Sequence, residues 1–162
     1  MNRKDFFDAI GPLNSRPELD MEVIEIVEKS NYTQKKISYL VDTDERISAY
    51  VLIPKNYSHP CPGVICHHQH ASMYNRAKSE MVGLIGDPNL AYAKELACKG
   101  FVTLSADALP FEDRNWYGES WWGTEYFEMA TRLLQGQTLL AKVLSDISAS
   151  IDCLVSLPEV SG

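Results

Sequence analysis

The chain has 162 residues, and 45% of them are hydrophobic, which suits one compact domain with a real core. Its 15 basic and 22 acidic residues give a formal net charge of -7, so it lacks the basic surface with which proteins neutralise nucleic acid or anionic lipid. We therefore expect no nucleic-acid and no membrane partner, and a small molecule or a protein instead.

The apolar runs of this chain are short. Residues 50–53 and 63–66, for example, are far shorter than the roughly 20 apolar residues that span a bilayer. The amino terminus, MNRKDFFDAIG, has no long apolar signal core, so we expect a cytoplasmic protein. The four cysteines show no close pairing such as CxxC, which favours reduced thiols in that compartment.

The first 20 residues contain one short helical segment, 4–10, and we expect residues 1–20 to form an amino-terminal leader. Residues 21–162 form the remaining domain. It begins with strand patterns at 23–27, 35–41 and 46–53, with an acidic turn of residues 42–45 between the last two. This pattern predicts antiparallel strands at the amino end of a sheet.

A parallel pair of strands is predicted next. Residues 63–66 are apolar without polar alternation, as in a strand that is covered on both faces. A helix over 90–99 follows, with Asp87 as its N-cap and Pro88 in its first turn, and residues 101–105 form a second buried strand. A strand, a helix and a strand in this order indicate a parallel pair with a crossover helix, which is typical of an α/β fold.

Two amphipathic helices complete the pattern. Apolar residues at helical spacing occur over 126–134 and again over 140–155, and Pro158 closes the second helix. The alternation of strands and helices predicts a third parallel strand after it. Only residues 159–162 are left to form that strand.

Three histidines follow the strand at 63–66, in a segment that we call the histidine loop (residues 67–72, HHQHAS). Backbone amides at the carboxyl end of a parallel strand can point into the crevice where α/β sheets bind ligands, and two such amides can stabilise an oxyanion. A metal site is one alternative, because imidazole is a common ligand. Only His68 and His70 would face the same way, however, and no second cluster supplies further ligands. A third possibility is an ordinary polar loop.

A second polar cluster follows the strand at 101–105, and we call it the acidic loop (residues 107–114, DALPFEDR). The carboxyl ends of parallel strands meet at one edge of a sheet, so we expect the acidic loop to lie beside the histidine loop. Its carboxylates and its arginine could brace the histidine loop or bind a polar substrate. Trp116 opens an aromatic group, residues 116–127, which either walls a substrate pocket or packs an inserted helix onto the domain.

These segments together resemble the α/β-hydrolase superfamily, specifically its dienelactone-hydrolase-like and acetyl-esterase-like branch. The resemblance extends from residue 21 onward and is most specific in CHHQHASMYNRAKSE (66–80) and in the acidic loop. It implies an α/β fold that corresponds to the amino-terminal half of an α/β-hydrolase, in which antiparallel strands lead into a parallel sheet with flanking helices.

The resemblance also implies a reaction, the hydrolysis of an ester or a lactone, without cofactor or metal. The backbone amide of Gln69 or His70 would contribute to the oxyanion hole. Five side chains would border the substrate: His68, Asp107, Glu112, Arg114 and Trp116.

The nucleophile of that family stands directly after a segment such as LPEV (157–160), and the acid and histidine of the triad come later. We therefore expect none of these three residues within 1–162, and a domain that ends before the nucleophile elbow.

The expected partners follow from the strand order of the family, 1-2-4-3-5-6-7-8. The strand at 63–66 would lie next to a missing strand and form an exposed apolar edge, which can pair with another chain. We expect either a homo-oligomer or pairing with a carboxyl-terminal half. Two alternatives to a hydrolase stay open, namely a non-catalytic module that pairs through this edge and a metal-binding protein that uses His68 and His70.

Overall fold

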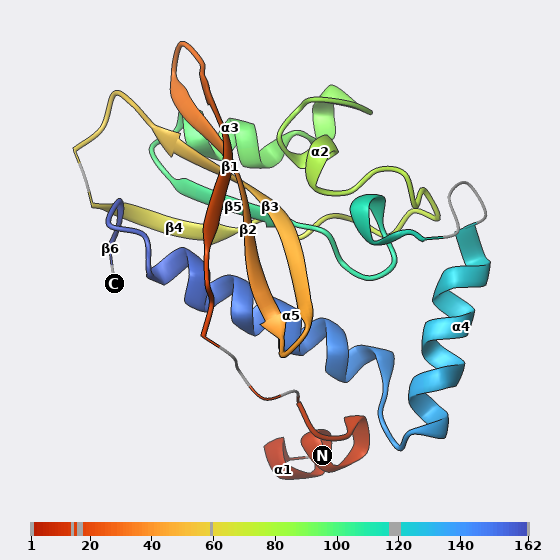
Figure 1. Ribbon diagram of the computed structural model, residues 1–162. Helices are drawn as coiled ribbons and strands as arrows, with labels where there is room; N and C mark the ends of the chain where they lie inside the picture. The colour runs from red at the N-terminus through yellow and green to blue at the C-terminus, as the bar shows by residue number, and fades with distance from the viewer. Residues whose placement is uncertain (1, 14, 16–17, 59, 117–120, 162) are drawn as a thin grey trace.

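A computed structural model describes residues 2–13, 15, 18–58, 60–116 and 121–161 of the chain (Figure 1). The helices and strands in chain order are α1 (Arg3–Ile10), β1 (Glu22–Glu28), β2 (Tyr32–Asp42), β3 (Glu45–Pro54), β4 (Cys61–Ile65), α2 (Lys78–Met81), the 3-10 turn η1 (Pro88–Leu90), α3 (Tyr92–Cys98), β5 (Val102–Ala106), the 3-10 turn η2 (Glu112–Arg114), α4 (Trp121–Leu134), α5 (Leu139–Val155) and β6 (Val160–Ser161). None of the described helices is long and apolar enough to cross a membrane.

Six strands of the described chain form a mixed sheet in the order β1-β2-β3-β5-β4-β6. The pairs β1–β2, β2–β3 and β3–β5 are antiparallel, whereas β4 is parallel to both β5 and β6. The predicted α/β fold, with antiparallel strands leading into a parallel pair and a crossover helix, is confirmed. The crossover between β4 and β5 contains α3, as the pattern of strand, helix and strand required.

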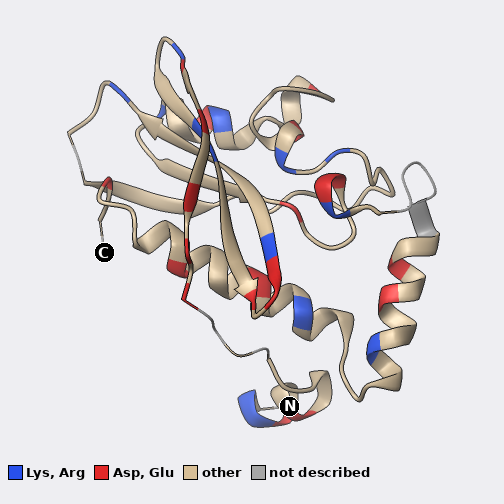
Figure 2. Cartoon of the chain, in the orientation of Figure 1, with Lys and Arg blue, Asp and Glu red and all other residues tan. Residues whose placement is uncertain are grey.

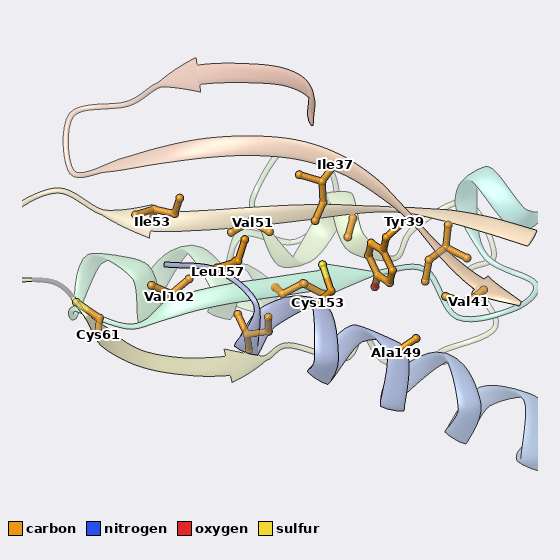
Figure 3. Close-up of a cluster of buried hydrophobic side chains, with 14 residues drawn as sticks. Ile37, Tyr39, Val41, Val51, Ile53, Cys61, Val102, Ala149, Cys153 and Leu157 are labelled. Atoms are coloured by element: carbon orange, nitrogen blue, oxygen red, sulfur yellow. The ribbon is translucent and has the colours of Figure 1, made fainter. Parts of the chain in front are cut away.

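Helices cover both faces of the sheet (Figure 1). Successive side chains of a strand point to opposite faces, and β3 shows the consequence. Val51 and Ile53 pack in the core on the α5 side, while Tyr50 and Leu52 pack with residues of α2 and α3 on the other side. Figure 3 shows Ala149 and Cys153 of α5 in the same core as Val51 and Ile53 of β3.

The predicted helix at 90–99 is divided in the structure. Asp87 does act as an N-cap, because its side chain accepts a hydrogen bond from the backbone amide of Asn89, but the turn that it caps is η1. Ala91 leaves helical geometry with φ -77° and ψ 46°, so α3 starts only at Tyr92. The short elements α2 and η2 were not predicted, because four and three residues are too few to show a period.

The apolar edge of β4 is partly covered, which corrects the expectation that it is fully exposed. β6 pairs with Cys61 and Pro62 at the start of β4, and the amide of Cys61 also donates to the carbonyl of Glu159 at 2.8 Å. The packing there is tight. A Cβ added at Gly63 would lie 2.9 Å from the Val160 side chain and 3.0 Å from that of Leu154. Residues 63–65 keep a free edge on this side among the described residues.

Candidate active-site rim

The histidine loop and the acidic loop lie side by side at the carboxyl ends of β4 and β5, and we call this edge the rim. The amide of Ala108 donates to Nε2 of His68 at 3.0 Å, which joins the two loops directly. Below them, the amide of Cys66 donates to the carbonyl of Leu104 at 2.8 Å, and Oγ of Ser105 donates to the carbonyl of Cys66 at 2.7 Å. The predicted convergence of the two loops is therefore confirmed.

His68 is buried within the rim, with 5% of its surface exposed. Nε2 accepts from the amide of Ala108, so Nδ1 carries the proton and donates to the carbonyl of Gln69 at 2.9 Å. Burial lowers the pKa of His68 to about 4, which keeps the ring neutral at pH 7. Because both ring nitrogens are occupied, His68 braces the loop; it neither faces the solvent nor has a nitrogen free to bind a metal.

The backbone amides of Gln69 and His70 are free donors. Neither amide donates to any acceptor within the described part of the chain, and both residues are exposed. Two unoccupied amides beyond the end of a parallel strand are the arrangement that an oxyanion hole needs. The bracing of His68 immediately before them restricts where they point.

Lys78 forms a buried ion-pair cluster directly under the rim. Its Nζ lies 2.5 Å from Oδ2 of Asp107, 2.9 Å from Oε2 of Glu112 and 3.0 Å from Oδ2 of Asp113. The Glu112 carboxylate also accepts from the amides of Ala77 and Ser79, at 2.6 and 3.0 Å. These contacts fasten the amino end of α2 to the acidic loop.

Burial and charge act in opposite directions on the pKa values in this cluster. Burial alone would lower the pKa of Lys78, but the carboxylates of Asp107 and Glu112 raise it above its usual value. Burial raises the pKa of Asp107 to about 7, although Lys78 opposes the shift. Asp113 is more exposed, and hydrogen bonds from Ser48 and Lys78 outweigh its burial and lower its pKa to about 2. The cluster therefore holds Lys78 as an ammonium ion at neutral pH.

Arg114 is buried, and its guanidinium is bound within the protein. Its guanidinium donates to Oδ2 of Asp146 at 2.8 Å, to Oε1 of Glu45 at 2.5 Å and to the carbonyl of Asp107 at 3.1 Å. It thus ties the acidic loop to α5 and to the turn between β2 and β3. The acidic loop was expected either to brace the histidine loop or to bind a polar substrate. Arg114 and Asp107 fit a bracing role better, because both side chains are buried.

Glu112 is the predicted substrate-binding residue that lines a hollow. This hollow of about 400 Å³ opens among Tyr74, Asn75, Ser79, Ile85, Glu112, Asp113 and Asn115. A larger hollow of about 600 Å³ lies between residues 83–91 and α3, and none of the predicted site residues lines it. Figure 2 shows the acidic residues of η2 as a red segment of the cartoon.

Trp116 lies just beyond η2 and is 67% exposed, so it is available to a ligand and is not part of the core. Residues 117–120 of the predicted aromatic group lie outside the described residues. Further along α4, Tyr126 and Phe127 are exposed as well. The aromatic side chains of this group that the structure describes, Trp116, Tyr126 and Phe127, are therefore outside the core.

No group of three or more His, Cys, Asp and Glu residues is placed to hold a metal ion among the residues that the structure describes. His70 turns away from His68 toward α4, where its Nε2 lies 3.1 Å from Oε2 of Glu125. The metal alternative requires His68 and His70 to bind one ion together. The two rings instead form hydrogen bonds with different partners.

Three residues of the rim were missed as functional candidates: Lys78, Tyr74 and Glu125. Lys78 belongs to the segment that resembles the hydrolases, and that segment was its only signal. Glu125 had none, because it reaches the histidine loop from a helix 55 residues further along the chain.

The fold matches solved structures of esterases. A structure described as a "putative acetyl xylan esterase" from Bacteroides fragilis NCTC 9343 superposes with a TM-score of 0.78 and 16% identity, covering 97% of this chain and 43% of that one. A glucuronoyl esterase from Solibacter usitatus superposes with a TM-score of 0.57 and 14% identity, covering 98% of this chain and 49% of that one. The chain therefore has the fold of α/β-hydrolase-like esterases, and at these identities the likeness concerns the fold.

One sequence relative is named as a hydrolase. The chain is 28% identical over 159 residues to the "Putative hydrolase YtaP" of Bacillus subtilis (strain 168), and the match covers 98% of the chain and 51% of the relative. A scan against protein-family models gives no match. The chain thus spans about half the length of the proteins that it resembles in sequence and structure.

Proposed function

We propose that this chain is the amino-terminal part of a serine-type hydrolase of esters or lactones, and that it supplies the oxyanion hole. The observation that carries the proposal is the pair of amides at Gln69 and His70, which have no acceptor among the described residues and follow the buried His68 at the end of β4. The substrate carbonyl would lie against one or both amides. As a nucleophile attacks, negative charge would develop on the carbonyl oxygen, and the amides would stabilise it.

The nucleophile and its proton-transfer partners would come from a carboxyl-terminal segment. The free edge of β4 at residues 63–65 supports this part of the proposal, since a further parallel strand would complete the pairing that β6 begins. The exposed apolar stripe of α5 supports it too, because Leu140, Ile151 and Val155 are about half exposed along one side of the helix. A second segment that covers this stripe would bury them.

We assign Trp116 to substrate contact. Glu112 forms part of the wall of the hollow, because its side chain is 8% exposed and its carboxylate already binds Lys78 and Ser79. Six of the seven residues that line the 400 Å³ hollow carry hydroxyl, amide or carboxylate groups, and the seventh is Ile85. Trp116 is exposed and follows these residues in sequence. Such a lining suits a substrate rich in hydroxyl groups. The structural neighbours are named for acetyl xylan and glucuronoyl esters, which is consistent with this class.

The test compares the 162-residue chain with a form extended at its carboxyl end, using p-nitrophenyl acetate. We expect hydrolysis only by the extended form, and turnover by the short form would contradict the assignment. In the extended form, Gln69→Pro and His70→Pro each remove one amide hydrogen. The substitution at the amide that acts should lower kcat by roughly 10²–10³-fold. The matched variants Gln69→Ala and His70→Ala keep the amide and control for loss of the side chain.

A non-catalytic module is the second candidate, and the same free edge of β4 favours it. Such a module would pair with a second copy of the chain. Light scattering after size exclusion would show a dimer that weakens in Ile151→Lys, on the stripe of α5, but not in Leu134→Lys, a control on α4. A monomer at high concentration would remove this candidate.

A further inference from the structure

Helix α4 contacts the histidine loop through one carboxylate. Oε2 and Oε1 of Glu125 lie 3.1 and 3.2 Å from Nε2 of His70, and the hydroxyl of Tyr74 donates to Oε2 as well. Two donors from the loop region thus converge on a single side chain of α4. None of the contacts described for the oxyanion hole includes this carboxylate.

The direction of the hydrogen bonds at His70 follows from its other ring nitrogen. The amide of Ser72 donates to Nδ1 at 3.3 Å, so Nδ1 is an acceptor and Nε2 carries the hydrogen that Glu125 accepts. Both nitrogens of His70 are therefore in use. The ring is not free to act as a general base or as a metal ligand, and its remaining role is to hold the chain in place.

The backbone beside His70 needs such support. Ala71 and Ser72 have φ values of 41° and 53°, in the left-handed region that side chains disfavour. Phe111 of the acidic loop packs on the same group, with its ring 4.8 Å from that of Tyr74 and 5.3 Å from that of His70. Burial, together with Glu125, raises the pKa of Tyr74 to about 12, so its hydroxyl keeps the proton that it donates.

We infer that Glu125 is a positioning residue: through His70 and Tyr74 it holds the histidine loop in the conformation that presents the amides of Gln69 and His70. The catalytic meaning of this role rests on the proposed function. The restraint itself does not, because it is a property of the loop in the 162-residue chain. Helix α4 would then control the oxyanion hole without touching the substrate.

The test uses the 162-residue chain, with the imidazole nitrogens of His70 and the amide hydrogens of residues 69–72 followed by NMR. In the native chain we expect the tautomer of His70 that is protonated at Nε2. Glu125→Ala should shift His70 toward a mixture of tautomers and speed exchange of the Ser72 amide, which donates to Nδ1 of His70, by at least about tenfold, with little change in Tm. Glu125→Gln keeps one acceptor oxygen and should restore part of both signals.

Two further variants separate the inference from a general loss of stability. Tyr74→Phe removes one of the two donors and should speed the exchange of the Ser72 amide less than Glu125→Ala does. Glu95→Ala breaks an exposed ion pair with Lys99 on α3 and should leave the loop unchanged. Unchanged His70 signals and exchange in Glu125→Ala would overturn the inference. This outcome is separate from the proposed function, which fails if the extended form does not hydrolyse esters or if the 162-residue chain hydrolyses them alone.

Discussion

The ammonium group of Lys78 lies 2.5 Å from the carboxylate of Asp107, and both side chains are buried beneath the rim. Asp107 follows β5 directly, while Lys78 begins α2, so this one contact joins the two segments that form the rim. The buried ion-pair cluster of Lys78 therefore supports the rim that contains the amides of Gln69 and His70. The contribution of this cluster to the free energy of unfolding can be measured without an activity assay.

Replacing Lys78 by Met should cost about 3–5 kcal/mol of unfolding free energy, because it leaves the Asp107 carboxylate buried without its partner. Urea denaturation followed by circular dichroism measures the loss. Lys99→Met is the matched control, since Lys99 pairs with Glu95 on the exposed surface of α3 and should cost less than about 1 kcal/mol. Equal losses in the two variants would contradict the buried ion pair.

The buried, neutral His68 should make the protein less stable in mild acid. The pKa of His68 is about 4 in the folded chain and about 6.5 in the unfolded one, so the unfolded state binds more protons between these values. Stability from this group is complete above pH 6.5 and decreases as the pH falls toward 4. From pH 7 to pH 5 we expect the loss to be about 2 kcal/mol.

His68→Gln isolates this contribution, because glutamine can accept from the Ala108 amide but does not titrate. Chemical denaturation of both proteins at several pH values gives the comparison, and the carboxylates that titrate in this range are common to both. The native curve should fall more steeply below pH 6.5. Parallel curves would show that His68 is not held neutral.

Gly63→Ala should destabilise the protein by about 1–3 kcal/mol, because the added methyl group would overlap the side chains of Val160 and Leu154. Thermal unfolding measures this change. Gly123→Ala places the same methyl group on α4, where no atom of the described residues lies within 4 Å, and should stabilise by up to about 1 kcal/mol. A neutral Gly63→Ala would mean that β6 does not dock against β4 as described.

Arg114→Lys should cost at least about 1.5 kcal/mol, although it keeps the positive charge. Lysine cannot reach Asp146, Glu45 and the Asp107 carbonyl at once, as the planar guanidinium does. Arg46→Lys, at a partly exposed ion pair with Asp20, is the control and should change stability by less than about 1 kcal/mol. A stable Arg114→Lys variant would favour a surface role for this residue.

The strands and long helices were predictable because their signals are local. Strand β3 was expected at 46–53 and spans Glu45–Pro54. The prediction succeeded because successive side chains of a strand point alternately to the core on the α5 side and to the core on the α3 side. Helix α5 was expected over 140–155 and spans Leu139–Val155 for the corresponding reason, an apolar stripe at helical spacing. Both patterns can be read from a window of fewer than 20 residues.

The roles of the rim residues were less predictable. His68 and Arg114 were expected to border a substrate, yet each is buried and hydrogen-bonded within the protein. A sequence shows which side chains can donate or accept, but not which partners the fold brings to them. Trp116 is exposed and Glu112 lines a hollow, and contact of either residue with a substrate stays a prediction.

The amino-acid sequence by itself determined the kind and order of the longer strands and helices, and through them the meeting of the histidine and acidic loops at one edge of the sheet. Periodicity and the rule that parallel strands end together are sufficient for this. Only the tertiary structure decided that Lys78 pairs with Asp107 and that Glu125 accepts from His70. These partners are 29 and 55 residues apart, and their contact depends on packing between elements that no local pattern encodes.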